Sequence, residues 1–251
     1  MDQEQLKLSM QMTNHKKTLR NLAVFIFSVG ILFGMTLAGV ATWTDLEANF
    51  YNLEKVADES LTTLRCPVLM TVTETGTITA TFSNPSDLPV DPRMRAYISN
   101  PGPLRTIETT ISLAPGETKQ VHWAVTSEDV DYGDLILIKV LAFSYYKSPI
   151  REGTCGILVL NLPHLTGNQI FASTLAFSLL GMLIGVGLWV ANSRPLKGRM
   201  LDATHAMIGL TAVVLVDMVI SFRGAWLFGV LLFLVAVLLI AVIIANTALA
   251  S

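Results

Sequence analysis

A carboxylic acid lies within a long apolar run: Asp217, in the segment VVLVDMVIS. A carboxylate costs several kcal/mol in hydrocarbon unless it is paired, hydrated or protonated, so we expect Asp217 to face protein. Counting equal depths along two other apolar runs predicts hydrogen-bonding partners for it, namely Thr36, Ser173 and Thr174. Asp217 could serve a proton or ion step in a transporter, or it could lock helices together. A relay needs a second ionisable group nearby, and His205 lies about 18 Å away along the helix, so we favour the structural role.

The two cysteines, Cys66 and Cys155, both fall in the longest polar segment of the chain. In an oxidising compartment they can pair as a disulfide. Closing a loop of about 90 residues contributes on the order of 4 kcal/mol in the chain-entropy treatment. The alternative is two buried free thiols.

Motifs for catalysis or nucleotide binding do not occur: there is no HExxH, GxSxG or CxxC sequence, and no glycine-rich phosphate loop. His122 and His164 are isolated and predict surface positions rather than metal ligands. An acidic run could bind Ca²⁺ weakly, but its spacing is not that of an EF-hand loop and a solvated turn is favoured. This run comprises Glu128, Asp129, Asp131 and Asp134. We therefore expect no enzymatic activity, no catalytic residue, no metal site and no cofactor.

Apolar residues make up 52% of the chain, whose mean hydropathy is +0.55, and they concentrate in long runs. About 20 helical residues cross the roughly 30 Å of bilayer hydrocarbon. Four runs meet this length and predict transmembrane helices over 21–43, 168–192, 203–222 and 225–250. A secretory signal peptide is the alternative for the first run, but about 20 apolar residues is long for one, so an uncleaved anchor is favoured.

Lysines and arginines that flank the apolar runs are concentrated in two segments, 1–20 and 193–202. Such residues tend to stay cytoplasmic. The basic residues are Lys7, Lys16, Lys17, Arg20, Arg194, Lys197 and Arg199; on the opposite short loop there is only Arg223. We therefore predict a multi-pass plasma-membrane protein with both termini in the cytoplasm and residues 44–167 outside.

The segment 44–167 carries nine of the seventeen basic residues and fifteen of the nineteen acidic ones. Its acidic balance argues against nucleic acid or an anionic membrane surface as a partner. The chain has no N-x-S/T sequon free of proline, which fits a prokaryotic surface.

Apolar and polar residues alternate from Pro67 onward, in short runs separated by turn residues. This period of two predicts about seven strands. Such a yield is typical of an immunoglobulin-like sandwich, which we expect over 66–163. The side chains expected to point inward include Ile78, Ala80, Phe82, Met94, Ala96, Ile98, Val121, Trp123 and Val125.

The segment LAPGET, Leu113 to Thr118, is followed by Val121 and Trp123. It resembles the L-x-PGET-x-x-V motif of immunoglobulin-like domains in prokaryotic envelope proteins, the kind called CARDB or NEW3-like. The resemblance covers residues 66–161 and implies that fold with a binding or spacing role. A Cys66–Cys155 bridge would tie the first strand to the last, which differs from the bridge of antibody domains.

A helix is predicted over 44–65, with Thr44 or Asp45 as its N-terminal cap. Its apolar side chains recur at spacings of three and four and form one stripe, which we interpret as an interaction surface. The stripe includes Leu46, Phe50, Leu53 and Leu61. It could pair two chains as a short coiled coil, but it spans under three heptads, so packing on the β-domain or on a neighbouring subunit is favoured.

Small residues predict where two of the membrane helices touch. Gly30 and Gly34 in the first run, and Gly181 and Gly185 in the second, each form a GxxxG face that permits close backbone approach. We expect these two helices to pack together; dimerisation through either motif, and hence a homo-oligomer, is the alternative.

The sequence thus predicts a mixed membrane protein: four transmembrane helices with an extracytoplasmic all-β immunoglobulin-like sandwich inserted between the first two. Its expected role is that of a non-enzymatic accessory, assembly or scaffold subunit of a membrane complex. Its expected partners are membrane lipids and other integral membrane subunits, without nucleic acid. A small transporter or ion-coupled subunit using Asp217 is one alternative, and a ligand-sensing receptor is another.

Overall fold

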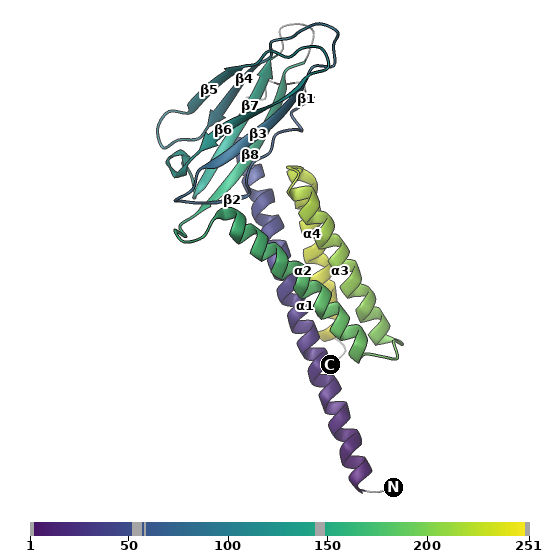
Figure 1. Ribbon diagram of the computed structural model, residues 1–251. Helices are drawn as coiled ribbons and strands as arrows, with labels where there is room; N and C mark the ends of the chain where they lie inside the picture. Colours follow the sequence, from purple (N-terminus) through teal and green to yellow (C-terminus); the bar gives the residue numbers. More distant parts are fainter. Residues whose placement is uncertain (1–2, 52–56, 58, 144–148, 249–251) are drawn as a thin grey trace. The chain divides into compact units, whose positions relative to one another are not determined.

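The computed structural model describes residues 3–51, 57, 59–143 and 149–248. Within these described ranges, helix α1 comes first (Gln3–Tyr51), eight strands follow, and three helices complete the order shown in Figure 1. These last helices are α2 (Gly167–Asn192), α3 (Arg199–Ser221) and α4 (Trp226–Ala248).

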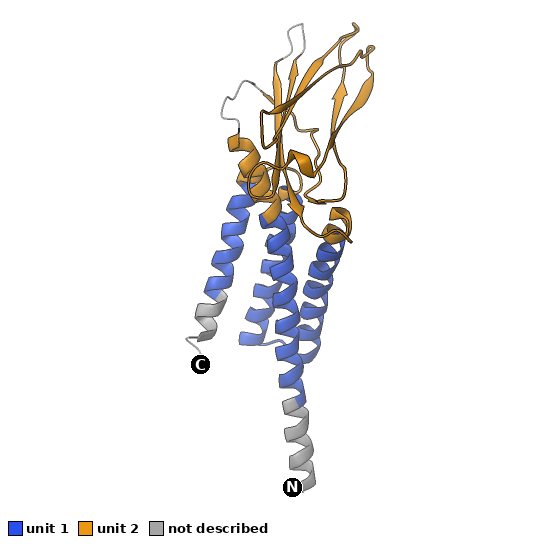
Figure 2. Ribbon diagram, turned by 90° about the vertical axis from the view of Figure 1, so that its left-hand side faces the viewer, with its two compact units in different colours: residues 1–39, 172–220, 228–251 blue, residues 40–171, 221–227 orange. Residues whose placement is uncertain are grey.

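The chain divides into two compact units (Figure 2). We name them the helical unit, residues 1–39, 172–220 and 228–251, and the β-containing unit, residues 40–171 and 221–227. Helix α1 contributes residues to both units.

The predicted fold class is wrong. The order is a long N-terminal helix, then the strands, then three helices, and the β-containing unit is not an all-β domain between two helices, because it includes residues 40–51 of α1 and the α3–α4 connection. Over the described residues, three helices are long and apolar enough to cross a membrane: His15–Tyr51, Gly167–Asn192 and Arg199–Ser221. The described apolar part of α4, Trp226–Val242, is shorter.

Helix α1 continues past the expected boundary at Trp43 because no glycine or proline in TDLEANFY interrupts it. The expected cap at Thr44 is therefore wrong: its hydroxyl donates to the Ala41 carbonyl inside the helix, at 3.0 Å. The helix predicted to reach residue 65 is wrong at its end as well, since Glu59–Ser60 forms strand β1.

The strands form two sheets. The larger has the order β1-β8-β7-β4-β5, with β2 also pairing with β8, and the smaller consists of β3 and β6. The strands are β1 (Glu59–Ser60), β2 (Leu69–Thr71), β3 (Gly76–Ser83), β4 (Arg93–Ile98), β5 (Arg105–Thr110), β6 (Thr118–Val125), β7 (Leu135–Phe143) and β8 (Arg151–Leu160).

Strand β8 has a gap along one edge. On that edge β1 pairs in parallel with Arg151 and Glu152, and β2 pairs in parallel with 158–160. Between them the chain crosses to the smaller sheet, where Arg65 bridges to Thr79 of β3. Among the described residues, therefore, no strand lies beside residues 153–157 of β8 on this edge.

The core of the β-containing unit lies between the two sheets. The alternation predicted for β3, β4 and β6 is confirmed, because every side chain expected to point inward there is buried. These residues are Ile78, Ala80, Phe82, Met94, Ala96, Ile98, Val121, Trp123 and Val125.

The opposite face of the larger sheet is also covered in part. Ala48 of α1 packs with Leu135 and Leu137 of β7. The end of α1 is therefore built into the fold of this unit.

Candidate functional site

A cavity of about 410 Å³ lies in the β-containing unit beside the gap along β8. Its walls come from the end of α1, the β1–β2 connection, β8 and the α3–α4 connection. All four segments belong to the same unit. Because the gap leaves backbone without a strand neighbour, side chains of other elements can reach β8 here.

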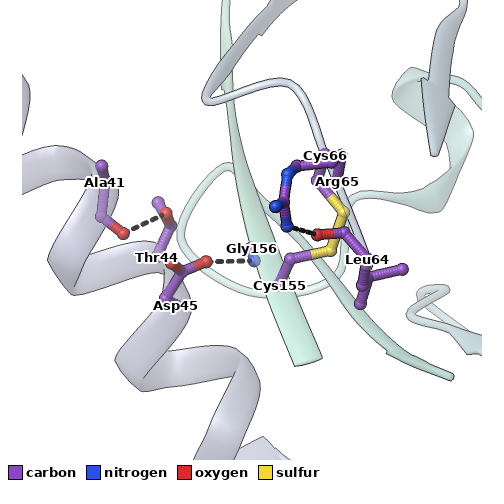
Figure 3. Close-up of a disulfide and its surroundings, with 8 residues drawn as sticks. All are labelled: Ala41, Thr44, Asp45, Leu64, Arg65, Cys66, Cys155 and Gly156. Atoms are coloured by element: carbon purple, nitrogen blue, oxygen red, sulfur yellow. Dashed lines mark hydrogen bonds between the residues drawn. A yellow bond between two sulfur atoms is a disulfide. The ribbon is translucent and has the colours of Figure 1, made fainter. Parts of the chain in front are cut away.

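Thr44 and Asp45 of α1 lie directly against β8 at this point (Figure 3). Gly156 permits the approach, since a Cβ on it would collide with the Thr44 carbonyl. The Gly156 N–H donates to Asp45 Oδ1 at 3.3 Å. A helix side chain thus takes the position that a neighbouring strand would otherwise hold.

Burial dominates the chemistry of Asp45, which is 9% exposed. Loss of hydration raises the pKa of this carboxyl from 3.8 to about 7, and the hydrogen bond from Gly156 opposes the rise. Asp45 lies two residues beyond the run 21–43 that we predict to span the membrane. Sequence reasoning treated Asp45 only as a helix cap and missed this position.

The disulfide predicted between Cys66 and Cys155 is present, next to Asp45 and Gly156 (Figure 3). Cys66 precedes β2 and Cys155 lies in β8. The disulfide therefore links the connection between β1 and β2 to the part of β8 that has no strand neighbour on this edge. Both cysteines line the cavity.

Most charged side chains around the cavity already have partners. Arg65 Nη1 donates to the carbonyls of Thr62 and Leu64, at 2.8 and 2.7 Å. Glu59 pairs with Arg151 at 3.1 Å.

Glu152 also lines the cavity, and it pairs with Lys139 at 2.8 Å. The ammonium-bearing side chain is 5% exposed and the carboxylate side chain 14% exposed. This ion pair is therefore largely withdrawn from water.

The predicted interaction stripe does not form one helical face. Leu61 is buried in the core of the β-containing unit, whereas Phe50 is exposed and its ring lies 6.1 Å from that of Trp226. Leu46 is half-buried, and Leu53 lies outside the described residues. The face of α1 that is buried here instead carries small and polar side chains, because β8 offers glycine at the contact. They are Ala41, Thr44, Asp45 and Ala48.

Asp217 is fully buried, on the face of α3 that also carries Met207, Leu210, Val214 and Met218. The expectation that it faces protein agrees with this position. Its expected partners lie on more open faces: Thr36 is exposed and donates to the Leu32 carbonyl of its own helix, at 2.8 Å. Ser173 is exposed and Thr174 is half-buried. Counting depth placed these residues along their helices but could not give the direction of their side chains.

The two GxxxG faces meet in the helical unit. A Cβ on Gly30 would lie 2.6 Å from Met182 N, and one on Gly181 would lie 2.8 Å from Gly30 Cα. A Cβ on Gly185 would lie 2.7 Å from the backbone N of Phe27. Helices α1 and α2 therefore touch through their backbones.

Gly34 belongs to the same contact, where a Cβ would lie 2.7 Å from Ser178 Oγ. Ser178, which the sequence reasoning missed, is fully buried and donates to the Gly30 carbonyl at 2.9 Å. Its position three residues before Gly181 places it on the same small-residue face, which is the signal that could have found it.

Two members of the acidic run, Asp129 and Asp131, are held by contacts within the chain. Asp129 is buried, pairs with Arg105 at 2.8 Å and accepts a hydrogen bond from the Thr126 N–H. Asp131 accepts from the Tyr51 hydroxyl, and burial with this contact raises the pKa of Tyr51 to about 12. Within the described ranges, no three His, Cys, Asp or Glu side chains gather as a metal site would require.

No protein-family model matches the sequence, and no curated protein matches it. Solved structures similar to part of the chain include the CARDB domain of a Pyrococcus furiosus protein in complex with di-metal ions. It is 18% identical, with a TM-score of 0.32, over 39% of this chain and 90% of that domain. This is the kind of domain that the LAPGET segment resembles.

Two enzymes are also similar to part of the chain. A β-glucuronidase of Bacteroides uniformis is 17% identical with a TM-score of 0.29, over 37% of this chain and 12% of the enzyme. A cycloisomaltooligosaccharide glucanotransferase of Paenibacillus is 17% identical with a TM-score of 0.31, over 41% of this chain and 14% of the enzyme. At such TM-scores, none of these similarities identifies a family or a function.

Proposed function

We propose that this protein is a non-enzymatic accessory, assembly or scaffold subunit of a plasma-membrane complex that presents its β-containing unit outside the cell. One observation carries the proposal. Thr44, Asp45 and Ala48, which follow the first apolar run in the same helix α1, pack on β7 and β8. A unit that incorporates the end of a membrane helix stays at the membrane surface. Its partners are therefore proteins embedded beside it.

The helices supply a second line of support. Large apolar side chains are exposed on α2 and α4, and exposed apolar surface of this kind is covered by lipid or by another helix. On α2 they are Phe177, Leu180, Leu183 and Ile184; on α4 they include Phe228, Leu231, Leu234 and Leu238. Membrane lipids and other integral membrane subunits are the partners that suit these faces.

The orientation can be tested with two single-cysteine variants in cells, Gln120→Cys in β6 and Lys197→Cys between α2 and α3. Both native positions are exposed, and the native cysteines are already paired. We expect a membrane-impermeant maleimide to label Q120C in intact cells and to label K197C only after lysis. Labelling of K197C in intact cells, with Q120C protected, would contradict the proposal.

The role as a subunit is tested by purification in a mild detergent followed by mass spectrometry. We expect an integral membrane protein to accompany the chain at fixed stoichiometry. A lone monomer with no such companion would count against the proposal.

An ion-coupled role for Asp217 is the second candidate, favoured by the full burial of a carboxylate in an apolar helix. Asp217→Asn distinguishes the two. Loss of transport or proton flux with the companion retained supports coupling, whereas loss of the companion alone supports an assembly role.

A further inference from the structure

One carboxylate oxygen in the cavity beside β8 accepts no hydrogen bond from the described residues. Asp45 Oδ1 accepts from Gly156, whereas Oδ2 has no hydrogen-bond donor among the described residues. No lysine or arginine of the described chain lies within ion-pair distance of this carboxyl group. A carboxylate that is nine-tenths buried with an unused oxygen is costly unless a donor reaches it.

One cation on the cavity wall is also without a counterion. Arg223, in the α3–α4 connection, is exposed and makes no ion pair with any residue that the structure describes. Arg65 is held by two carbonyls, and Glu59 and Glu152 have their own cations. Among the described residues that line the cavity, Asp45 is the carboxyl group with no cation partner, and Arg223 is the cation that no acceptor holds. This pair suits a small zwitterion.

The position of these two residues in the chain indicates where such a ligand comes from. Asp45 follows the first predicted span by two residues, and Arg223 directly follows the third, which ends at Phe222. Trp226, also in the cavity wall, is a residue type that gathers at the headgroup level of membranes. A cavity of about 410 Å³ is large enough for a headgroup.

We propose that this cavity binds the phosphoethanolamine headgroup of a membrane lipid, whose ammonium donates to Asp45 Oδ2 and whose phosphate accepts from Arg223. The shared chemistry is a primary ammonium joined to a phosphate. A quaternary ammonium has no N–H to donate, and a phosphoglycerol headgroup has no cation for Asp45. This inference rests on the proposed membrane location.

The test uses the purified full chain in detergent, offered phosphatidylethanolamine, phosphatidylcholine and phosphatidylglycerol of one acyl composition, with retained lipid read by native mass spectrometry. We expect roughly tenfold preference for phosphatidylethanolamine, which corresponds to about 1.4 kcal/mol, because its ammonium donates a charge-assisted hydrogen bond to Asp45. Asp45→Asn should abolish this preference, and Arg223→Gln should weaken retention of all three lipids.

Glu59→Gln is the matched control, because Glu59 lines the same cavity but is already paired with Arg151. It should retain the preference. Asp45→Glu, which keeps the charge, guards against a folding defect, and no variant should unfold more than a few degrees below the native chain.

Equal retention of the ethanolamine and choline lipids by the native chain would overturn the proposal, and so would an unchanged preference in D45N. If free phosphoethanolamine displaces the lipid at equal concentration, the cavity does not select a membrane lipid as its ligand, and the proposal is wrong on that point. The maleimide result at Q120C and K197C is independent of lipid retention. A correctly oriented chain without the lipid preference therefore refutes this inference and leaves the proposed function standing.

Discussion

Asp45 of α1 and Gly156 of β8 are 111 residues apart in the sequence, and the backbone N–H of Gly156 donates to Asp45 Oδ1 at 3.3 Å. The hydrogen bond forms at the part of β8, between its pairings with β1 and with β2, where no described strand lies beside it. A carboxyl group on a helix thereby completes the edge of a sheet. The stability of this edge depends on that side chain and on its protonation.

Asp45 should make the stability of the β-containing unit fall as pH rises. Its pKa in the folded protein, about 7, exceeds the ordinary 3.8, so folding favours the protonated carboxyl. The stability that Asp45 contributes is full below pH 3.8, declines above it, and is lost once the pH exceeds about 7. The full difference is about 4 kcal/mol.

Thermal unfolding at pH 5 and pH 8, for the native chain and for Asp45→Asn, measures this contribution. We expect the native unit to lose several degrees between the two values and the variant to lose less. Parallel pH profiles for the two proteins would show that Asp45 titrates at its ordinary pKa.

Substituting Gly156 by alanine should destabilise the β-containing unit. The added Cβ would collide with the Thr44 carbonyl, and overpacking of this kind costs about 1–3 kcal/mol. Gly102→Ala is the matched control, because a Cβ there meets nothing within 4 Å. Near-UV circular dichroism during heating should show a lower transition for G156A alone. If both variants melt like the native protein, α1 does not pack against β8 as closely as described.

Local patterns in the sequence predicted the interior of the sheets, and contacts between distant segments escaped them. The alternation in β3, β4 and β6 repeats every two residues, so the buried side is visible in a few residues such as Ile78 and Ala80. At the end of α1, the apolar stripe that includes Leu46 and Phe50 predicted the wrong face of the helix as the buried one. The contact with β8 selects the opposite kind of side chain, small enough to meet Gly156.

For the membrane helices, too, the sequence predicted some contacts and missed others. Gly30 and Gly181 were visible as members of GxxxG faces, whereas the direction of Thr36 away from the buried face was not. Small residues mark where backbones can approach, but the rotation of a helix about its axis is set by all of its neighbours.

The ion pair of Lys139 and Glu152 should matter far more than the surface pair of Arg93 and Glu108. Both cross between strands of the larger sheet, but only the first is largely buried. Glu152→Gln leaves the Lys139 ammonium buried without this carboxylate, which costs about 3–5 kcal/mol. Glu108→Gln removes the exposed pairs of Glu108 with Arg93 and with Arg95 and should change stability little. Denaturant midpoints of the two variants measure the contrast, and equal midpoints would contradict the burial of the first pair.

Alanine substitutions at glycines of the helical unit should change stability in opposite directions. Alanine favours a helix over glycine by about 1 kcal/mol, so Gly187→Ala and Gly209→Ala, where a Cβ meets nothing within 4 Å, should not lower stability. Gly30→Ala and Gly181→Ala should lower it despite the same gain, because their Cβ atoms would reach the facing backbone at 2.6 and 2.8 Å. Unfolding temperatures in one detergent measure all four variants. If G30A and G181A are as stable as G187A, helices α1 and α2 do not touch through their backbones.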